Sequence, residues 1–474
     1  MGSGLSTYMN SEIDCDVIVV GGGITGLATA WYVRQHHPET TVAVLEASPR
    51  VGGKIASATV AGHRVDCGPD AFLARVPGAV ELADELGLRD SLVAPATGQA
   101  WVWSRGRLRA LPEGLVLGVP SRLRPLARSG IVSWRGVARA ALGEVRATRS
   151  AAADPTVADA IGAHLGREVV DRLVDPLLGG INASSCDRLS LASAAPNIAE
   201  AAASPRLMRA LRASGATRTR GQIGVEQSQP VFLAPSGGVS TMVVELTRQL
   251  PAGTVRANHA VRSIERESTG SWLVMSTGGS MRCRRVVLAT PASIAAALLR
   301  ATSAGAADQL GAIRASSVAL TLLAYRAADV ALPPGSGMLV PRIEGRMLTA
   351  SSWWHQKWPH LVTPGTVLVR ASAGRDGDTR FTDLADDALI RALTNDLGEL
   401  LGLRARPIDA HVTRWPDGFP QYDSGHAARV EVAEAHLRRD APGIALAGAS
   451  YRGIGIPACI RSAKAAATAV TALA

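Results

Sequence analysis

A glycine-rich hexapeptide near the amino terminus is the first feature whose residue types and spacing suggest chemistry. The apolar run Val17–Val20 is followed directly by Gly21, Gly22, Gly23, Ile24, Thr25 and Gly26, which form the pattern G-x-G-x-x-G. In such a pattern the first glycine permits a tight turn and the second lets a pyrophosphate approach the backbone. The third lets a helix pack closely on a strand. Because the N–H groups at the start of the following helix are free, they can hold the pyrophosphate. The hexapeptide therefore indicates a dinucleotide site.

An acidic residue stands where such a site needs one. Glu46 ends a second apolar run, twenty residues after Gly26, and a carboxylate there accepts hydrogen bonds from ribose hydroxyls. A glycine pair with nearby cations follows, and its candidate cofactor contacts are Ala47, Arg50, Gly53 and Lys54. The pattern E-x-x-x-R-x-G-G is typical of flavoproteins, so the sequence favours FAD over NAD.

These residues require a strand–helix–strand unit to position them. The apolar runs Val17–Val20 and Thr41–Leu45 predict buried parallel strands, with a helix from Ile24 to about His36 between them. Near the other end of the chain, Ile444–Ala447 predicts a strand, and an alanine-rich helix follows to Ala474. We therefore expect the last residues to complete the first domain.

The rest of the chain predicts two further regions. Residues 113–227 are rich in Ala, Leu and Arg and predict helices, whereas strand-like runs return between 254 and 415. The predicted fold is α/β, with a Rossmann-type FAD-binding domain, a mixed-sheet α+β substrate domain and a helical insertion. The predicted boundaries are 12–85, 228–305 and 440–474 for the first domain, 86–112 and 306–439 for the second, and 113–227 for the helical domain.

Several separated motifs resemble those of a known family. Besides Gly21–Gly26 and Glu46–Lys54, they are Gly68–Leu73, Ala96–Gln99, Asp175–Gly180, Lys357–Pro359, Pro420–Tyr422 with Gly425-His426, and Gly453–Ala467. The sequence resembles the FAD-dependent porphyrinogen oxidases of haem synthesis, within the monoamine oxidase superfamily, and most of all the oxygen-dependent oxidases that form coproporphyrin III. The resemblance implies six-electron oxidation of coproporphyrinogen III to coproporphyrin III, in which three O2 become three H2O2.

The resemblance also implies roles for particular residues. Gly68, Pro69, Asp70 and Ala71 would pass along the flavin, and the backbone of Val261 would hold the adenine. Trp415 would lie close to the isoalloxazine, while Gly448 with Gly455, Ile456 and Pro457 would cover the flavin where a helix begins. Arg75 and Lys357 are candidate contacts for the substrate carboxylates, with surface salt bridges as the alternative. No catalytic side chain is assigned.

Some positions depart from the family pattern and keep other functions open. Asn182, Ser184 and Ser185 stand where many relatives have Tyr, Gly and Asp, and Ala458 and Ala463 stand where Asp and Gly are frequent. The alternatives are a protoporphyrinogen IX oxidase, a specialised-metabolism flavin oxidase for another pyrrolic, amine or polyene compound, and a non-catalytic flavin-binding or membrane-docking protein.

Composition narrows the partners. The chain has 474 residues and a net charge of +10, and residues 104–150 contain ten Arg against two acids. This basic stretch would face a membrane, guide an anionic substrate or be a solvated surface. The sequence has no nucleic-acid motif, and its five scattered cysteines predict neither disulfides nor a metal site. We expect a cytoplasmic protein without a signal peptide, with peripheral membrane contact and transient ferrochelatase contact as further possibilities.

Overall fold

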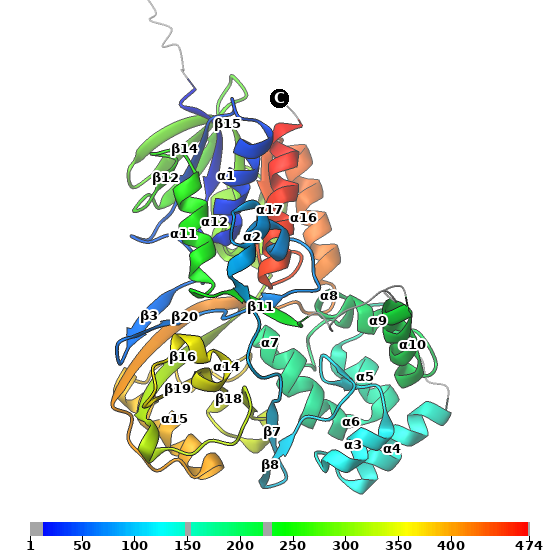
Figure 1. Ribbon diagram of the computed structural model, residues 1–474. Coiled ribbons are helices and arrows are strands. Elements are labelled where there is room, and N and C mark those ends of the chain that lie inside the picture. Colours follow the sequence, from blue (N-terminus) through cyan, green and yellow to red (C-terminus); the bar gives the residue numbers. More distant parts are fainter. Residues whose placement is uncertain (1–12, 147–152, 221–229, 473–474) are drawn as a thin grey trace, which may run out of the picture.

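A seven-stranded sheet forms the core of the upper region in Figure 1, which shows a computed structural model. The structure describes residues 13–146, 153–220 and 230–472. The strand order is β12-β2-β1-β15-β14-β13, and β21 also pairs with β15. The strands are β1 (Cys15–Val20), β2 (Val42–Leu45), β12 (Val255–Arg256), β13 (Val261–Arg266), β14 (Trp272–Ser276), β15 (Gly279–Leu288) and β21 (Ile444–Leu446). The β12-β2-β1-β15-β21 pairings are parallel, whereas β13, β14 and β15 pair antiparallel.

Helices cover both faces of this sheet, which explains why its central strands are apolar throughout. In β1, Val17 and Val19 belong to one hydrophobic cluster, and Ile18 and Val20 belong to another on the opposite face. The first cluster includes residues of α1 (Ile24–His36), α2 (Ala79–Glu85), α11 (Ser240–Gln249) and α17 (Ile456–Thr471). The second includes residues of α12 (Ala292–Leu299), α13 (Ala304–Gly311) and α16 (His426–Asp440).

A second seven-stranded sheet lies below the first in Figure 1. Its order is β20-β16-β19-β18-β17-β7-β8. The helix α15 (Asp386–Leu401) packs Leu389, Leu393 and Leu397 against this sheet, in one hydrophobic cluster with residues of its strands. The strands are β7 (Trp101–Ser104), β8 (Arg107–Ala110), β16 (Ala315–Arg326), β17 (Gly337–Leu339), β18 (Leu348–Trp353), β19 (Thr366–Ala373) and β20 (Asp409–Pro420). All its pairings are antiparallel except that of β7 with β17.

A helical region completes the molecule at the lower right of Figure 1. Its elements are α3 (Leu123–Ser129), α4 (Trp134–Val145), α5 (Val157–Leu165), α6 (Arg167–Val169), the π-helical segment Val170–Gly179, α7 (Gly180–Asn182), α8 (Leu191–Ala194), α9 (Pro196–Ala202) and α10 (Leu207–Arg220). Before them, the short strands β9 (Leu115–Val116) and β10 (Val119–Pro120) form a hairpin. The α/β class with a mixed second sheet and a helical insertion is confirmed.

The exact domain boundaries stay a prediction. The packing of α13 and α16 onto the first sheet favours assigning both helices to the first domain, although the predicted boundaries placed them in the second. Sequence periodicity cannot show which sheet a helix covers, because only the partner's surface decides that.

Short elements connect the two sheets. The hairpin of β3 (Ser57–Val60) and β4 (His63–Asp66) contacts β16 and β20, and β11 (Phe232–Pro235) pairs with both β5 (Phe72–Leu73) and β6 (Leu92–Val93). The carboxyl ends of the parallel strands and the start of α17 point toward this junction (Figure 1). Among the described residues, no helix is both long and apolar enough to cross a membrane.

Candidate functional site

The glycine loop between β1 and α1 packs as its spacing predicts. Gly21 has φ 105°, and its N–H donates a 2.8 Å hydrogen bond to the carbonyl of Leu45. A Cβ at Gly21 would lie 2.7 Å from the carbonyl oxygen of Ala289, and one at Gly26 would lie 1.9 Å from that of Gly21. Gly21 and Gly26 are therefore required by the protein's own packing.

Gly23 is different, because the protein leaves space around it. The atom nearest to a Cβ at Gly23 would be the Cα of Gly53, at 3.9 Å. Gly23 is the N-cap residue of α1, and no side chain caps this helix. Free N–H groups beside an open backbone suit a pyrophosphate, so this turn fits the dinucleotide part of FAD.

Glu46 lies beside the loop, as its position after β2 predicts. Its Oε2 accepts a 2.7 Å hydrogen bond from the N–H of Gly22, and its Oε1 accepts from the N–H and the hydroxyl of Ser48 at 2.9 and 2.8 Å. Ala47, between these two residues, is exposed. The carboxylate is thus fixed in orientation at the edge of the glycine loop.

The segment before Val261 lies against the same strand end. The N–H of His259 donates to the carbonyl of Glu46 at 2.8 Å, and the N–H of Asn258 donates to that of Ser48 at 3.0 Å. Val261 begins β13 two residues later, 215 positions after Glu46 in the sequence. The structure therefore brings the backbone predicted to hold adenine next to the acid predicted to hold ribose.

Arg50 organises the second glycine pair. Its guanidinium donates to the carbonyl of Gly53 at 2.7 Å and lies 5.9 Å from the centre of the Trp415 ring. Lys54, which follows Gly53, is exposed over part of its surface, yet the protein around its ammonium group partly desolvates it, and this lowers the pKa of Lys54. Arg50 thus shapes the turn next to Gly23 rather than projecting freely from it.

Gly68 to Ala71 follow β4 and lie against Lys54. A Cβ at Gly68 would be 2.0 Å from the carbonyl oxygen of Lys54. Asp70 is held by Lys357, whose Nζ is 2.6 Å from Oδ2, and by Arg370, whose Nη2 is 3.4 Å from Oδ1. Burial alone would raise the pKa of Asp70, but the charges of Arg370 and Lys357 hold it well below its ordinary range.

The two predicted substrate contacts lie in different settings. Lys357 is mostly buried in its ion pair with Asp70, so a substrate carboxylate would compete with that acid. Arg75 is exposed after β5 and forms no hydrogen bond or ion pair within the part of the chain that the structure describes. Both contacts stay predictions.

Trp415 brings the second sheet to this stretch. It lies in β20, where Val318 of β16 is its partner, and its indole N–H donates a 3.0 Å hydrogen bond to the carbonyl of Cys67. The side chain is half-buried. The structure therefore places Trp415 beside the stretch that is predicted to follow the flavin.

The last candidates lie at the start of α17. Gly448 has φ 120°, and a Cβ there would lie 3.7 Å from the hydroxyl of Thr25 in α1. Gly455 is the N-cap of α17, Ile456 and Pro457 begin the helix, and no side chain caps it. Two uncapped helix starts, those of α1 and α17, thus lie in one region beside Thr25 and Gly448.

Sequence reasoning missed two residues beneath these stretches. Asp66 is buried at the end of β4, and its Oδ2 accepts a 2.8 Å hydrogen bond from the N–H of Val239 before α11. Arg370 donates to the carbonyl of Gly68 at 2.9 Å in addition to its pairing with Asp70. A single arginine within the apolar run of β19 was the signal that could have drawn attention to Arg370.

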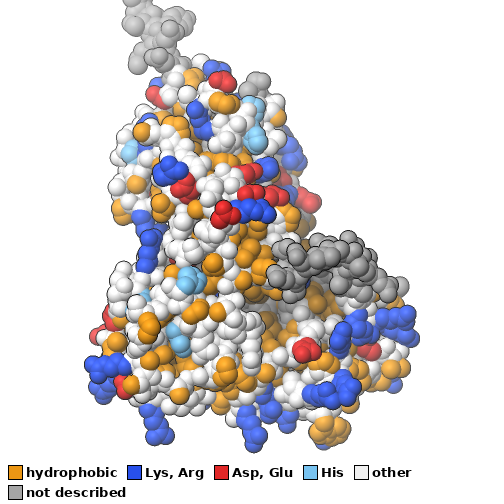
Figure 2. Space-filling view, in the orientation of Figure 1, with side chains coloured by type: hydrophobic (Ala, Val, Ile, Leu, Met, Phe, Trp, Pro, Cys, Tyr) orange, Lys and Arg blue, Asp and Glu red, His pale blue; other side chains and the backbone are white. Residues whose placement is uncertain are grey.

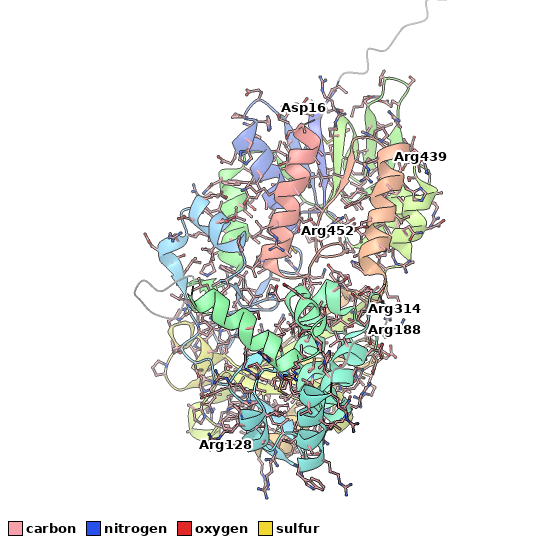
Figure 3. All side chains as sticks on the ribbon, turned by 90° about the vertical axis from the view of Figure 1, so that its right-hand side faces the viewer. Asp16, Arg128, Arg188, Arg314, Arg439 and Arg452 are labelled. Carbon is pink, nitrogen blue, oxygen red and sulfur yellow. The ribbon has the colours of Figure 1, made fainter. Side chains whose placement is uncertain are left out.

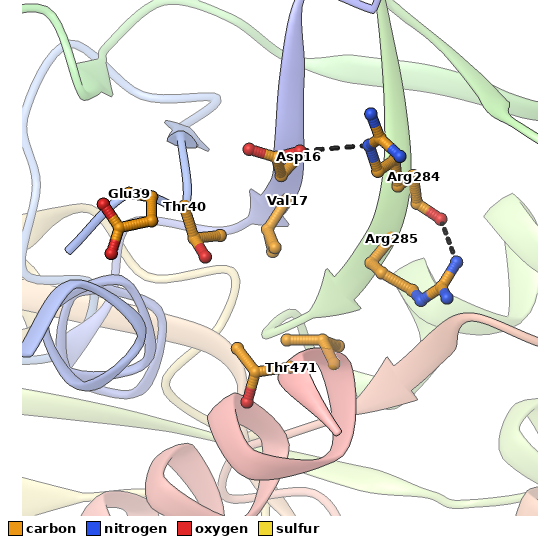
Figure 4. Close-up of a pocket in the computed structure, with 8 residues that line it drawn as sticks. Asp16, Val17, Glu39, Thr40, Arg284, Arg285 and Thr471 are labelled. Carbon is orange, nitrogen blue, oxygen red and sulfur yellow. Dashed lines mark hydrogen bonds and ion pairs between the residues drawn. The ribbon is translucent and has the colours of Figure 1, made fainter. Parts of the chain in front are cut away.

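A small cavity lies elsewhere and belongs to none of these groups. It has a volume of about 220 Å³ and is lined by Asp16, Val17, Glu39, Thr40, Arg284, Arg285, Val470 and Thr471 (Figure 4). Asp16 and Arg284, on the neighbouring strands β1 and β15, form an ion pair of 3.1 Å in its lining. The cavity lies at the amino end of β1 and the carboxyl end of α17, whereas the glycine loop lies at their other ends.

Together, the glycine loop, Glu46, the Val261 segment and the start of α17 fit a dinucleotide-binding flavoprotein, with a second sheet and a helical region beside this candidate site. The sequence matches the family described as flavin containing amine oxidoreductase over residues 24–471, so the chain belongs to that family. It is an FAD-dependent oxidoreductase.

Three relatives named coproporphyrinogen III oxidase align with nearly the whole chain. The coproporphyrinogen III oxidase of Bacillus subtilis (strain 168) is 33% identical over 95% of this chain and 96% of its own length. That of Staphylococcus aureus is 30% identical over 96% of this chain and 99% of its own length. That of Mycobacterium leprae is 34% identical over 94% of this chain and 96% of its own length.

Solved structures share the fold. A structure from Exiguobacterium sp. 255-15 that carries the provisional name protoporphyrinogen oxidase superposes with a TM-score of 0.86, at 27% identity over 97% of this chain and 99% of that one. A cyclohexylamine oxidase from Brevibacterium oxydans has a TM-score of 0.68 at 18% identity, over 97% of this chain and 99% of that one, which shows the fold alone.

Proposed function

We propose that this protein oxidises coproporphyrinogen III to coproporphyrin III in haem biosynthesis, with O2 as the final electron acceptor. The observation that carries the proposal is the similarity, at 30–34% identity, to three coproporphyrinogen III oxidases over almost the full length of both chains. A cytoplasmic location and contact with a ferrochelatase, which would receive the product, belong to the same proposal.

Three separate parts of the chain would bind the pyrophosphate, the ribose and the adenine of FAD. The N–H groups after Gly23 would bind the pyrophosphate, Glu46 the ribose and the backbone at Val261 the adenine. When bound, FAD accepts two electrons at a time, so a six-electron oxidation requires three rounds and reduces three O2 to three H2O2. The uncapped start of α17 would stabilise negative charge at the flavin, while Trp415 and the Gly68–Ala71 stretch would restrict its movement and exclude water.

No acid or base is assigned to the reaction, because the proposed chemistry needs mainly orientation of the substrate. Arg75 is the proposed carboxylate contact that carries a free guanidinium within the described chain, and Arg suits planar carboxylates. Lys357 would act on substrate only through rearrangement of its pair with Asp70.

The experiment is a substrate panel on the purified holoprotein. Porphyrin fluorescence should appear with coproporphyrinogen III, with three O2 consumed and three H2O2 formed for each porphyrin. Protoporphyrinogen IX, a set of amines and a polyene are the comparison substrates. A yellow protein that oxidises one of these faster than coproporphyrinogen III would contradict the proposed substrate and leave the flavin assignment intact.

The residues that depart from the family pattern make contacts within the protein, and these contacts do not point to a different substrate. The buried Asn182 donates to the carbonyl of Leu178 at 2.8 Å. The carbonyl of Ala183 accepts from the N–H of Asp376 at 2.8 Å and from the hydroxyl of Ser316 at 2.9 Å. The carbonyl of Asn182 also accepts from Nε2 of Gln421, which follows β20, at 3.4 Å, and the carbonyl of Ser184 accepts from Arg342, which lies between β17 and β18, at 3.3 Å. We therefore propose that the segment from Asn182 to Ser184 joins the helical region to the second sheet.

The basic stretch supports a proposal of peripheral membrane contact. Trp134 and Val145, at the two ends of α4, are 74% and 75% exposed, and Arg135 lies 5.3 Å from the centre of the Trp134 ring. Arg122, Arg124 and Arg128 are exposed on or next to α3 and form no ion pair within the described residues.

These exposed residues lie at one extremity of the molecule. Lys and Arg side chains gather along the lower edge of Figure 2, and Arg128 lies at the end opposite Asp16 in Figure 3. Exposed Trp and Arg side chains together suit the surface of a bilayer with anionic lipids.

A further inference from the structure

The motif Pro420–Tyr422 with Gly425-His426 has no role in the function proposed above, yet its side chains make specific contacts. The hydroxyl of Tyr422 donates a 2.6 Å hydrogen bond to the carbonyl of Ala449 and accepts a 2.7 Å hydrogen bond from the N–H of Gly453. Tyr422 is 3% exposed. One hydroxyl therefore closes the turn formed by residues 449–453 from inside the protein.

His426 supports Tyr422 and contacts the same turn. The two rings stack with centroids 4.0 Å apart and an angle of 14° between their planes. The Nε2 of His426 is 2.9 Å from the carbonyl of Tyr451, to which the neutral ring can donate. Burial lowers the pKa of His426, and this favours the neutral ring. The turn is thus held at three backbone groups by two stacked side chains.

The turn leads directly into the start of α17. Gly448 and Gly453 both have φ 120°, a conformation that glycine adopts without strain. Gly455, two residues after Gly453, is the N-cap residue of α17. A Cβ at Gly453 would lie 2.6 Å from the Cβ of Ala458 in the first turn of that helix. The position of residues 449–453 therefore determines where α17 begins.

The backbone of Tyr422 is held from the opposite side. Its carbonyl accepts a 2.8 Å hydrogen bond from the N–H of Ser190 in the helical region. The neighbouring Gln421 donates through Nε2 to the hydroxyl of Ser316 at 2.9 Å and to the carbonyl of Asn182 at 3.4 Å. Tyr422 therefore connects the helical region and the second sheet with the turn before α17.

We propose that Tyr422 is a positioning residue, whose hydroxyl holds the 449–453 turn so that the N–H groups at the start of α17 face the flavin. This inference rests on the proposed placement of α17 beside the flavin. It assigns to Tyr422 no contact with substrate.

The test compares Tyr422→Phe with Tyr451→Phe. Tyr422→Phe removes both hydrogen bonds to the turn and keeps the ring stacked on His426. Tyr451 lies in the same turn, and its buried hydroxyl has no hydrogen-bond partner among the described residues, so Tyr451→Phe is the matched control.

The first measurement is amide hydrogen exchange of the peptide spanning residues 449–455. Loss of two hydrogen bonds should accelerate its exchange by about tenfold or more in Tyr422→Phe, with little change in Tyr451→Phe. His426→Phe, which removes the bond to the Tyr451 carbonyl and retains an aromatic ring, should accelerate the same peptide and serves if Tyr422→Phe does not fold.

The second measurement is the flavin itself. The Tyr422→Phe holoprotein should show a shifted visible absorption spectrum and a lower midpoint potential, because the helix N–H groups would no longer face the reduced flavin. Unchanged exchange together with an unchanged spectrum and potential would overturn the inference. A wild-type protein that forms no coproporphyrin would overturn the proposed substrate instead, since exchange and spectrum do not depend on it.

Discussion

Trp415 and Cys67 are 348 positions apart, yet the indole N–H of Trp415 donates a 3.0 Å hydrogen bond to the carbonyl of Cys67. This bond fixes β20 of the second sheet to the stretch that precedes Gly68. It joins the second sheet to the segment that follows the β3–β4 hairpin, where the candidate site residues lie close together.

Trp415→Phe should weaken FAD binding by about tenfold. It leaves the carbonyl of Cys67 without its donor, at a cost of about 1–3 kcal/mol, and so loosens the following stretch that is proposed to lie along the flavin. Titration of apoprotein with FAD gives the affinity. Trp101→Phe is the control, since the Trp101 indole also donates to a carbonyl, that of Pro334 at 2.9 Å, but within the second sheet region. Equal FAD affinities in both variants would argue against a role for Trp415 at the flavin.

Gly23→Ala should reduce FAD retention with little effect on stability, whereas Gly26→Ala should reduce the stability of the apoprotein. Gly23 has φ −71° and open space around it, so Ala should change the free energy of unfolding of the apoprotein by less than about 0.5 kcal/mol and yet reduce FAD retention. Gly26→Ala should destabilise the apoprotein by about 1–3 kcal/mol or more, because its Cβ would overlap the carbonyl of Gly21. Denaturant titration and FAD content distinguish the two. Full FAD occupancy in Gly23→Ala would place the pyrophosphate elsewhere.

Glu46→Ala should lower FAD affinity by at least tenfold, since it removes both the ribose acceptor and the partner of the Gly22 N–H. Charge-assisted hydrogen bonds of this kind contribute about 1.5–3 kcal/mol. Isothermal titration of the apoprotein measures the loss, and Glu39→Ala at an exposed acid is the control. An affinity equal to that of the control would mean that another group binds the ribose.

The pH dependence of stability should contain a contribution from Asp66. Burial raises its pKa to about 6, whereas in the unfolded chain it should titrate near its usual value of about 3.9. Because the folded protein holds this proton more tightly, the free energy of unfolding should fall as the pH rises from about 4 to 6, by up to about 3 kcal/mol.

Asp66→Asn tests this contribution, since the side-chain oxygen can still accept from the Val239 N–H. The variant should lose the decline between pH 4 and 6 and gain stability relative to wild type at pH 7. Urea unfolding at several pH values gives both curves, with Asp84→Asn as an exposed control. Parallel curves for Asp66→Asn and wild type would show that Asp66 titrates normally.

The basic surface of α3 should bind anionic membranes. Replacing Arg122, Arg124 and Arg128 together with Gln should weaken binding to vesicles containing phosphatidylserine, by about 1 kcal/mol for each cation. Sedimentation with vesicles measures binding. Because the chain has nine tryptophans, a vesicle-induced change in fluorescence that Trp134→Phe removes reports the insertion of Trp134. If vesicle binding is unchanged but kcat/KM falls and loses its salt dependence, these residues guide the substrate instead. No change in either would leave them as a solvated surface.

The sequence alone predicted the first βαβ unit, because the residues that form its turn and its candidate ribose contact are close together in the chain. The strand Val17–Val20, the glycine loop and Glu46 lie within thirty residues, and the spacing of small, apolar and acidic residues there follows from the turn, the helix and the predicted ribose contact. The class of cofactor followed from the same stretch.

Only the tertiary structure decided which distant residues lie at the candidate site. Trp415 meets Cys67, the turn before Val261 meets Glu46, and Tyr422 meets the turn before α17, each through one hydrogen bond or a few between segments far apart in sequence. Lys357 was predicted as a substrate contact, and the structure shows its charge beside Asp70. Such pairings depend on how two sheets and a helical region pack together. The periodicity of one segment does not show which other segment it packs against.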